Sequence, residues 1–264
     1  MTSKGGEYVV FYFTGTGNSL YVAKMLDENI ISIPQIVNSE NLDFSADKIG
    51  IVCPIYGHEM PKMVKDFLYK ATFHTDYLYV VLTYGKRHAN AVELAQNALQ
   101  KANKQADYIK TLLMVDNFLP VFDMNEEVKL DKKVEQQIEK VKFDIAHKNK
   151  TIQTVTLQDR EVHNEYLARV NNKAESVWAN FLVTDECVGC GICTKVCPVG
   201  CIYLENQKAI HTDQNCQACF ACIHACPKLA IQLNNIPEKN PTARYRNLHI
   251  PLNEIVVSNN QTEN

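Results

Sequence analysis

The sequence predicts an α/β protein in two parts: a doubly wound parallel sheet and, after it, a small α+β domain rich in cysteine. Two observations lead to this prediction. Short apolar runs alternate with stretches of helical period through residues 1–120. Such alternation is typical of right-handed strand–helix–strand units, with helices on both faces of a sheet. Beyond residue 182 the helical period stops, and nine of the ten cysteines lie between Cys187 and Cys226.

The first part contains the strand and helix signals in alternation. Four segments are apolar enough for strands buried on both faces of a parallel sheet, the last of them weakly: residues 7–13, 48–54, 76–84 and 106–115. Residues 31–37 give the poorest strand signal. Three segments between the runs have a helical period: residues 18–28, 61–71 and 88–102.

Two further helices are predicted before the cysteines. Residues 126–148 are highly charged but carry one apolar stripe, so we expect a solvated helix packed on the sheet. Residues 161–181 repeat the pattern, with Trp178 beside the stripe in core or interdomain packing. The expected organisation is therefore a sheet domain, a connecting helix, a cysteine-rich domain and a tail that ends in disordered residues 258–264: residues 1–150, 151–181, 182–234 and 235–264.

Composition excludes several classes of protein. Hydrophobic residues make up 46% and charged residues 22% of 264 residues, which is normal for a globular chain. A net charge of −3 gives no nucleic-acid footprint. No apolar run approaches the roughly 20 residues that span a bilayer. The first ten residues lack the features of a signal peptide, so we expect a cytoplasmic protein, in which dense thiols indicate metal rather than disulfides.

The cysteines form two runs with the same spacing, C-x2-C-x2-C-x3-C-P. The runs comprise Cys187, Cys190, Cys193 and Cys197 before Pro198, and Cys216, Cys219, Cys222 and Cys226 before Pro227. A C-x2-C-x2-C loop can wrap three thiolates around three corners of a cubane cluster, and the fourth thiolate comes from elsewhere. Structural zinc would use two separated C-x2-C pairs, which leaves the other cysteines surplus. The spacing therefore favours iron–sulfur clusters over zinc.

Residues 182–234 resemble the bacterial-type two-[4Fe–4S] ferredoxins, with a hairpin at 201–210 and a returning strand at 229–233. In that family the fourth cysteine of each run ligates the cluster of the other run. The resemblance thus implies two [4Fe–4S] clusters with crossed ligand sets. The first set is Cys187, Cys190, Cys193 and Cys226, and the second is Cys216, Cys219, Cys222 and Cys197.

Three other residues need an interpretation beside these runs. Cys201 could be an alternative ligand, but a small residue packed near a cluster is the favoured interpretation. Cys53 lies inside a buried strand and is expected in the core. We expect His224 to be a surface histidine rather than a ligand, since the four-thiolate set is already complete.

A glycine-rich stretch joins the first predicted strand to the first helix: Thr14, Gly15, Thr16, Gly17, Asn18 and Ser19. It could be an ordinary helix N-cap. It could also hold a phosphate, because glycine lets backbone N–H groups approach an anion and a helix N-terminus adds positive potential. The stretch lacks the lysine of a Walker A loop and the G-x-G-x-x-G of dinucleotide folds.

The stretch resembles the FMN-phosphate loop of flavodoxins, S/T-x-T-G-N-S/T, and the likeness extends loosely over residues 5–150. Residues 54–61 and 82–90 follow strands where that family places the two loops beside the flavin ring. The resemblance implies that further FMN contacts come from Pro54, Ile55, Tyr56, Gly57, Thr83, Tyr84 and Gly85. Tyr56 and Tyr84 would lie against the ring, although core or rim positions also fit them. His58 and Glu59 could tune flavin protonation or simply lie at the surface.

The whole chain resembles the fused flavodoxin–ferredoxin proteins of anaerobic bacteria. That resemblance implies electron transfer between FMN and two clusters for redox partner proteins. With the cofactors the net charge would be roughly −9, which favours partners with basic docking faces. Two alternatives remain: an FMN-dependent reductase of a small substrate such as a quinone, and a ferredoxin whose first domain only docks partners. The tail resembles the tail of that family but departs from it at Leu248 and His249, so it is assigned no function.

Overall fold

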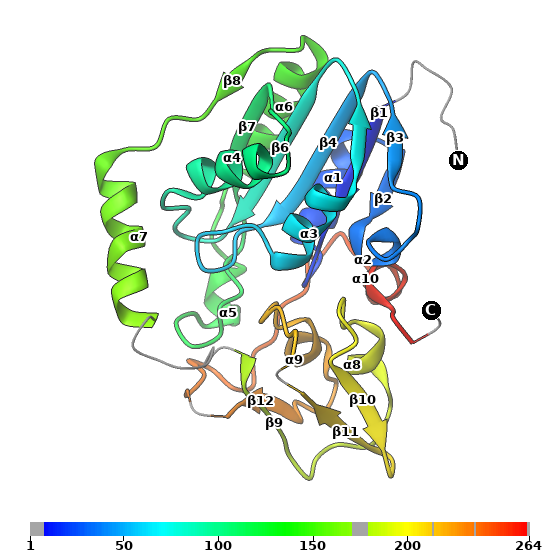
Figure 1. The fold of residues 1–264 in the computed structure, drawn as a ribbon. Helices are drawn as coiled ribbons and strands as arrows, with labels where there is room; N and C mark the ends of the chain where they lie inside the picture. The colour runs from blue at the N-terminus through cyan, green and yellow to red at the C-terminus, as the bar shows by residue number, and fades with distance from the viewer. Residues whose placement is uncertain (1–7, 171–178, 213, 235, 263–264) are drawn as a thin grey trace.

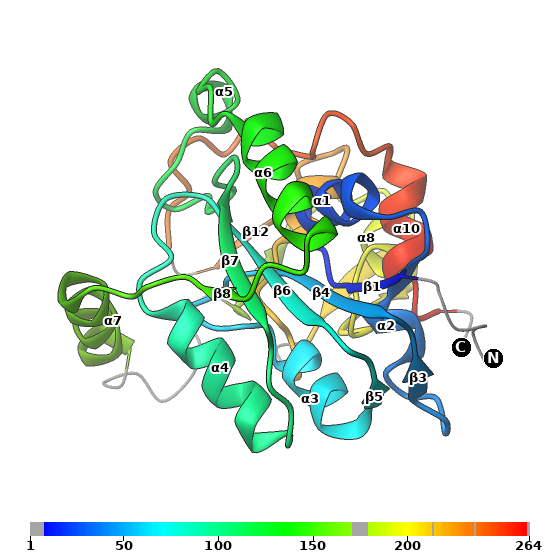
Figure 2. The same ribbon diagram turned by 90° about the horizontal axis from the view of Figure 1, so that it is seen from above.

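The first half of the protein is a parallel sheet with helices on both faces (Figures 1 and 2). The computed structural model describes residues 8–170, 179–212, 214–234 and 236–262. Within them the main sheet has the order β2-β1-β4-β6-β7-β8, and all its pairs are parallel. Its strands are β1 (Tyr8–Tyr12), β2 (Ile30–Ser32), β4 (Lys48–Pro54), β6 (Leu78–Tyr84), β7 (Tyr108–Leu113) and β8 (Thr151–Ile152). When the first five of these strands are renumbered 1 to 5 along the chain, their order in the sheet is the flavodoxin-like 2-1-3-4-5.

Two apolar layers hold the helices on the sheet. The strands carry apolar side chains on both faces, because both faces are covered. One layer packs under α1 (Asn18–Leu26) and α6 (Val134–Ala146), and the other under α3 (Lys62–Lys70) and α4 (Ala91–Lys101). Figure 2 shows these two pairs on opposite sides of the sheet. The predicted doubly wound fold is thus confirmed.

Some predicted boundaries were wrong. Residues 126–148 form two helices, α5 (Met124–Glu127) and α6, because the chain turns through Lys133, whose φ is 52°. Residues 31–37 end the short β2 and then form α2 (Ile33–Ile36). A small parallel pair outside the main sheet was not predicted: β3 (Asp43–Ser45) and β5 (Thr72–His74).

The predicted connecting helix also differs at both ends. In the structure α7 (Leu157–Val170) begins before residue 161. Phe181, the expected helix end, instead opens β9 (Phe181–Val183), which pairs antiparallel with β12 (Ile231–Leu233). The strand is favoured there because Phe181 is buried in the apolar core of the cysteine-rich half. Trp178 lies outside the described residues.

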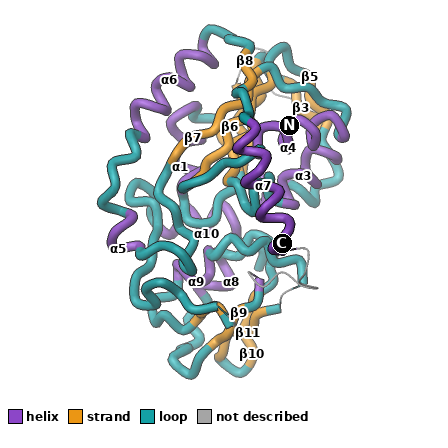
Figure 3. The backbone as a smooth tube through the Cα atoms, turned by 90° about the vertical axis from the view of Figure 1, so that its left-hand side faces the viewer, coloured by secondary structure: helices purple, strands orange, loops and turns teal. Residues whose placement is uncertain are grey.

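The cysteine-rich half is small and lies below the sheet in Figure 1. Its two short helices lie within the cysteine runs, and a hairpin lies between the runs at the predicted place. These elements are α8 (Ile192–Lys195), β10 (Ile202–Glu205), β11 (Lys208–His211) and α9 (Ala221–Ala225). Figure 3 shows this half against one end of the sheet.

The tail packs on both halves and ends in α10 (Leu252–Asn259), beside α2 (Figure 1). Ser258 and Asn259 are almost fully buried, so the prediction of disorder from residue 258 was wrong where the structure describes the tail. Polar partners explain this order: Ser258 exchanges a 2.8 Å hydrogen bond with the Tyr12 hydroxyl and accepts one from the Ser32 hydroxyl. None of the described helices is both long and apolar enough to cross a membrane.

Candidate functional site

A cavity of about 710 Å³ opens where the sheet meets the cysteine-rich half. It is lined by the loops that follow β1, β4 and β6, by residues 115–118 after β7, and by residues 218–220 of the second cysteine run. We call it the junction cavity. It lies beyond the ends of the parallel strands at the topological switch point, where this class of sheet binds ligands. Every residue predicted to bind FMN lines it except Gly17.

The Thr14–Ser19 loop presents an uncapped helix end to the cavity. Gly17 is the N-cap of α1 and has φ 99°, a conformation that favours glycine. Its N–H donates to the Thr14 hydroxyl at 3.1 Å. The first N–H groups of a helix lack intrahelical partners, and this N-cap has no side chain to satisfy them. The loop therefore fits a phosphate group, which such N–H groups bind well.

The loop hydroxyls tie the loop to its neighbours. Ser19 Oγ and Thr83 Oγ1 share a 2.8 Å hydrogen bond, which joins the loop to β6. Thr16 Oγ1 accepts a 2.6 Å hydrogen bond from Asn117 after β7. Three strand ends are thus connected around the cavity. Asn117 was missed in the sequence, since no pattern there marks it.

Gly15 lies where the loop touches the second cysteine run. A Cβ at this position would lie 2.8 Å from the Cys219 carbonyl oxygen and 2.9 Å from the Tyr56 hydroxyl. A Cβ carbon almost never comes within about 3.0 Å of another heavy atom, so the close approach of these two segments favours glycine here. The loop on one side and the cysteine run on the other therefore share a wall of the cavity.

The two predicted ring-flanking tyrosines differ in their surroundings. Tyr56 points its hydroxyl toward Cys219, and burial, then the nearby Cys219 thiolate, raises its pKa well above the usual range. Tyr84 is half-buried, with its ring edge against His88. Both line the cavity, and their stacking on a flavin stays a prediction.

A pair of histidines stands at the cavity wall. His58 lines the cavity with φ 70°, and its Nδ1 lies 3.3 Å from Nδ1 of the buried His163 on α7. Burial, then the charges of His163, Arg169 and Arg87, lowers the pKa of His58 to about 4. His163 was not predicted, because the sequence does not show that α7 lies against the loop after β4.

The cavity also contains a partly buried carboxyl that the sequence did not indicate. Asp116 packs against Gly85, where a Cβ would meet its side chain. Burial raises the pKa of Asp116. Asp116 thus lines the same cavity as His58.

The cysteines of the first predicted ligand set lie together. They line one small, mainly apolar void: Cys187, Cys190, Cys193 and Cys226. Burial, and then the thiolates of the other three, raises the pKa of Cys193 to about 12. The void therefore collects soft donors from both runs, which is the donor chemistry of an iron–sulfur cluster.

The second predicted set also mixes the two runs. Burial raises the pKa of Cys222, and then the charges of Cys219, Cys197 and Cys216 raise it further. Cys197, from the first run, therefore lies among the cysteines of the second. This arrangement fits the crossed ligation, and the assignment of particular thiolates to a cluster stays a prediction.

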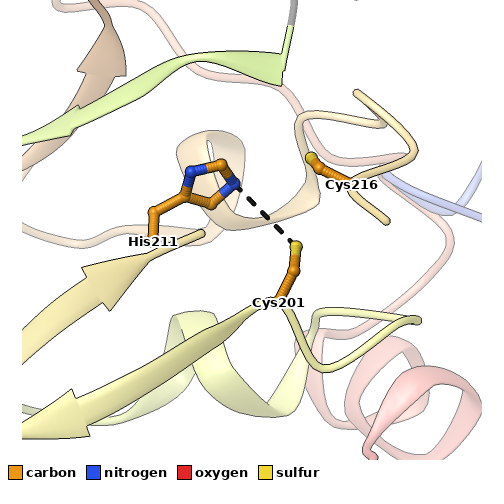
Figure 4. Close-up of side chains that lie close together, drawn as sticks. All are labelled: Cys201, His211 and Cys216. Carbon is orange, nitrogen blue, oxygen red and sulfur yellow. Dashed lines mark hydrogen bonds between the residues drawn. The ribbon is translucent and has the colours of Figure 1, made fainter. Parts of the chain in front are cut away.

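Cys201 lies beside the second set (Figure 4). Its Sγ is 3.5 Å from Cys197 Sγ and 3.9 Å from His211 Nε2. The ligand atoms of Cys201, His211 and Cys216 all lie within 4.8 Å of one another. Its thiol, as a hydrogen-bond donor, lowers the pKa of Cys197 and of Cys216. Cys201 is buried, as expected for a packed residue. Cys53 is fully buried in the sheet core, as predicted.

His224 is not a surface residue, and that prediction was wrong. It is buried between the second cysteine run, the Asn117 loop and the tail. Nδ1 accepts from the Tyr245 N–H at 3.0 Å, so Nε2 carries the proton and donates to the Asn117 carbonyl at 3.0 Å. Burial lowers the pKa of His224 to about 4. The ring therefore joins three segments that the sequence did not bring together.

The cysteine-rich half matches an iron–sulfur family model and parts of two known proteins. Residues 180–227 match the 4Fe-4S dicluster domain family. Over 67 residues, 25% of each chain, the protein is 39% identical to a subunit of the ion-translocating oxidoreductase complex of Methanosarcina acetivorans. It is 40% identical to the pyruvate synthase subunit PorD of Methanothermobacter marburgensis over 53 residues, 20% of this chain and 62% of that one. The matches thus span less than two thirds of these relatives.

Two solved structures match the sheet half weakly. A putative flavoprotein from Bacteroides uniformis is 19% identical, with a TM-score of 0.33, and the match covers 42% of this chain and 94% of that one. The Trp repressor binding protein from Bacillus subtilis is 13% identical, with a TM-score of 0.29, and the match covers 41% of this chain and 85% of that one.

The strand order and the family match together define the class of the protein. It joins a flavodoxin-like sheet to a 4Fe–4S cluster domain. Iron–sulfur clusters exchange single electrons, so the cysteine-rich half has an electron-transfer role. The match also disfavours the zinc interpretation.

Proposed function

We propose that the protein is an electron-transfer flavo-iron–sulfur protein, with FMN in the junction cavity and a [4Fe–4S] cluster in each crossed cysteine set. One observation carries the proposal: the phosphate-type loop and the second cysteine run wall the same cavity and touch at Gly15 and Cys219. An FMN held there would lie beside the second cluster. FMN exchanges electrons singly or in pairs, whereas each cluster takes one.

The residues of the site have separate roles in this proposal. The N–H groups at the start of α1 hold the phosphate, and Gly15 allows the close approach of the cysteine run. Tyr56 keeps its proton because burial raises its pKa, so it adds no charge between the two cofactors. Cys222 is buried, which would limit the access of water to the second cluster.

The two cluster sets differ in exposure. The second set adjoins the cavity through Cys219, while Cys190 of the first set is exposed. Electrons would therefore pass from the cavity through the second cluster to the first, and leave at Cys190. The charge of roughly −9 with cofactors favours partner proteins with basic docking faces at that end.

One observation favours the reductase alternative. Lys86, Arg87 and Arg169 line the junction cavity, and they would attract a polar or anionic small substrate to the flavin. Flavin reoxidation at high turnover by a quinone would support this alternative, whereas a carrier would react with it slowly. A domain that only docks partners is less consistent with a cavity of this size.

The test is the cofactor content after anaerobic purification: iron, acid-labile sulfide and the flavin released by denaturation. The proposal expects about eight irons, eight sulfides and one FMN per chain. A stepwise reductive titration would then show the reduction of both the flavin and the clusters. Eight irons without flavin would overturn the FMN site, and zinc in place of iron would overturn the cluster assignment.

A further inference from the structure

The tail contacts the outer side of the Thr14–Ser19 loop, opposite the junction cavity. Tail side chains or N–H groups contact four of the six loop residues: Thr14, Thr16, Gly17 and Asn18. None of the tail residues that make these contacts lines the cavity. The loop is therefore held between the cavity on one side and the tail on the other.

Two of these contacts fix carbonyl groups. Thr14 O accepts a 2.9 Å hydrogen bond from Asn259 Nδ2, and Thr16 O accepts one of 2.9 Å from the Asn247 N–H. In a trans peptide the C=O and the following N–H point in opposite directions, and the described chain has no cis peptide bond. The Thr14 carbonyl, which points outward to the tail, thus turns the Gly15 N–H away from the tail, toward the side on which Gly15 lines the cavity. The Thr16 carbonyl likewise turns the Gly17 N–H away from the tail, and that N–H donates to the Thr14 hydroxyl within the loop.

A third contact fixes the first residue of α1. Asn18 Oδ1 accepts from the Tyr245 hydroxyl at 2.6 Å and from Asn247 Nδ2 at 3.1 Å. Its Nδ2 donates to the Val115 carbonyl at 3.1 Å. The Asn18 side chain is thus held at both of its polar atoms, and the start of the helix cannot rotate freely.

The tail itself is anchored in the cysteine-rich half. Asn259 is fully buried, and its Nδ2 also donates to the Val196 carbonyl, next to Cys197, at 3.2 Å. The Tyr245 N–H donates to His224, which lies between Cys222 and Cys226. One amide and one ring therefore join the loop's outer side to segments that carry predicted cluster ligands.

We propose that the tail is a built part of the phosphate site, in which Tyr245, Asn247 and Asn259 are positioning residues that aim the loop N–H groups at the phosphate of FMN. The proposal rests on the proposed FMN site. Preorganised donors bind an anion more tightly because they need not be ordered on binding. The tail would then strengthen the binding of the phosphate and leave the binding of the flavin ring unchanged.

The test compares FMN with riboflavin, which has the same ring and no phosphate. Cluster-loaded protein, freed of flavin, is titrated anaerobically with each compound by flavin fluorescence. Asn259→Leu keeps the side-chain size and removes both amide donors, and Tyr245→Phe removes one hydroxyl. Asn253→Leu is the matched control, because Asn253 is an exposed asparagine on the same helix.

We expect Asn259→Leu to weaken the binding of FMN about tenfold, the equivalent of one lost hydrogen bond to a charged group. The binding of riboflavin should weaken less than about twofold. Tyr245→Phe should weaken FMN about threefold on the same reasoning, and Asn253→Leu should change neither affinity. Iron content must match the wild type. Equal losses for FMN and riboflavin would overturn the proposal and leave a purely structural tail. Wild-type protein that binds neither flavin would instead overturn the FMN site itself.

Discussion

The two halves of the molecule are held together by different kinds of side chain. The sheet half buries large apolar groups completely, among them Phe11, Phe67 and Leu82. The core of the cysteine-rich half mixes four buried cysteines with apolar residues from its short strands and helices, from loops and from the tail. A half this small gains little from apolar burial alone, so the metal must supply much of its folding energy. The sheet half does not depend on metal for its folding energy, so the two halves should respond differently to removal of the metal.

The largest expected effect is the removal of iron. We expect an anaerobic iron chelator to unfold the cysteine-rich half and leave the sheet folded. Amide hydrogen exchange measures both halves at once: protection in β10, β11 and α9 should fall to the level of an unfolded chain, while β4 and β6 keep theirs. Full protection in both halves after iron loss would show that the cysteine-rich half does not depend on metal for its folding.

The second prediction concerns the sheet core. Phe67→Ala should lower the free energy of unfolding of the sheet half by about 3–5 kcal/mol, because it leaves a cavity among packed rings. Phe67 is fully buried, 5.0 Å from the ring of Phe11 and 5.8 Å from that of Phe73. Denaturant unfolding measures the change. Tyr69→Ala on the same helix is the control; its side chain is 52% exposed, so its effect should stay near 0.5 kcal/mol.

The third prediction addresses the contact between the halves. Gly15→Ala would place a methyl group 2.8 Å from the Cys219 carbonyl, and the backbone there must move. We expect a loss of stability of about 1–3 kcal/mol, as for overpacking elsewhere. FMN affinity should fall as well, because the loop shifts relative to the cavity. Unchanged FMN affinity in a folded variant would show that the halves do not meet tightly at this point.

The smallest effect concerns protons at the cavity wall. The pKa of His58 is about 4 in the folded protein, against 6.5 as the ordinary value. Between these values the unfolded chain binds the proton more readily, so stability should fall as pH drops from about 6.5 to 4 and stay constant above that range. Burial is the main cause of the low pKa of His58, and the charges of the groups that face its ring lower it further: His163, Arg169, Arg87 and His88.

NMR titration of the His58 ring measures this pKa directly. His58→Asn is the matched variant, because asparagine tolerates the positive φ and does not titrate. It should lose stability less steeply than the wild type on acidification. An ordinary midpoint near 6.5 for His58 would refute the burial of this ring.

The parts of the fold that the sequence predicted are those with local signals. The run at residues 48–54 became β4 with the same boundaries, since every position but the last is buried and apolar runs report burial directly. The hairpin between the cysteine runs was predicted for a similar reason. The prediction of one helix over residues 126–148 was wrong, because the helical period continues across a turn at Lys133 that composition does not mark.

The site was predicted only where a motif marks it. The Thr14–Ser19 loop and the cysteine runs have recognisable spacing, and all of them adjoin the junction cavity or the cluster sets. Asn117, His224 and Asn259 are single polar residues, and each has a hydrogen-bond partner about 100 to 245 positions away. No periodicity records such pairs. Their burial becomes visible only when the segments are placed in space.

The hydrogen bond between Asn259 and Thr14 joins residues 245 positions apart. A growing chain releases β1, β4, β6 and β7 from the ribosome early, and these strands can pair before the tail exists. Contacts of such separation also close late in refolding, because loop closure costs entropy before the contact forms. The contacts between the tail and the Thr14–Ser19 loop therefore form late in biosynthesis, after both cysteine runs have emerged. Flavin uptake would then follow the synthesis of the cluster domain rather than precede it.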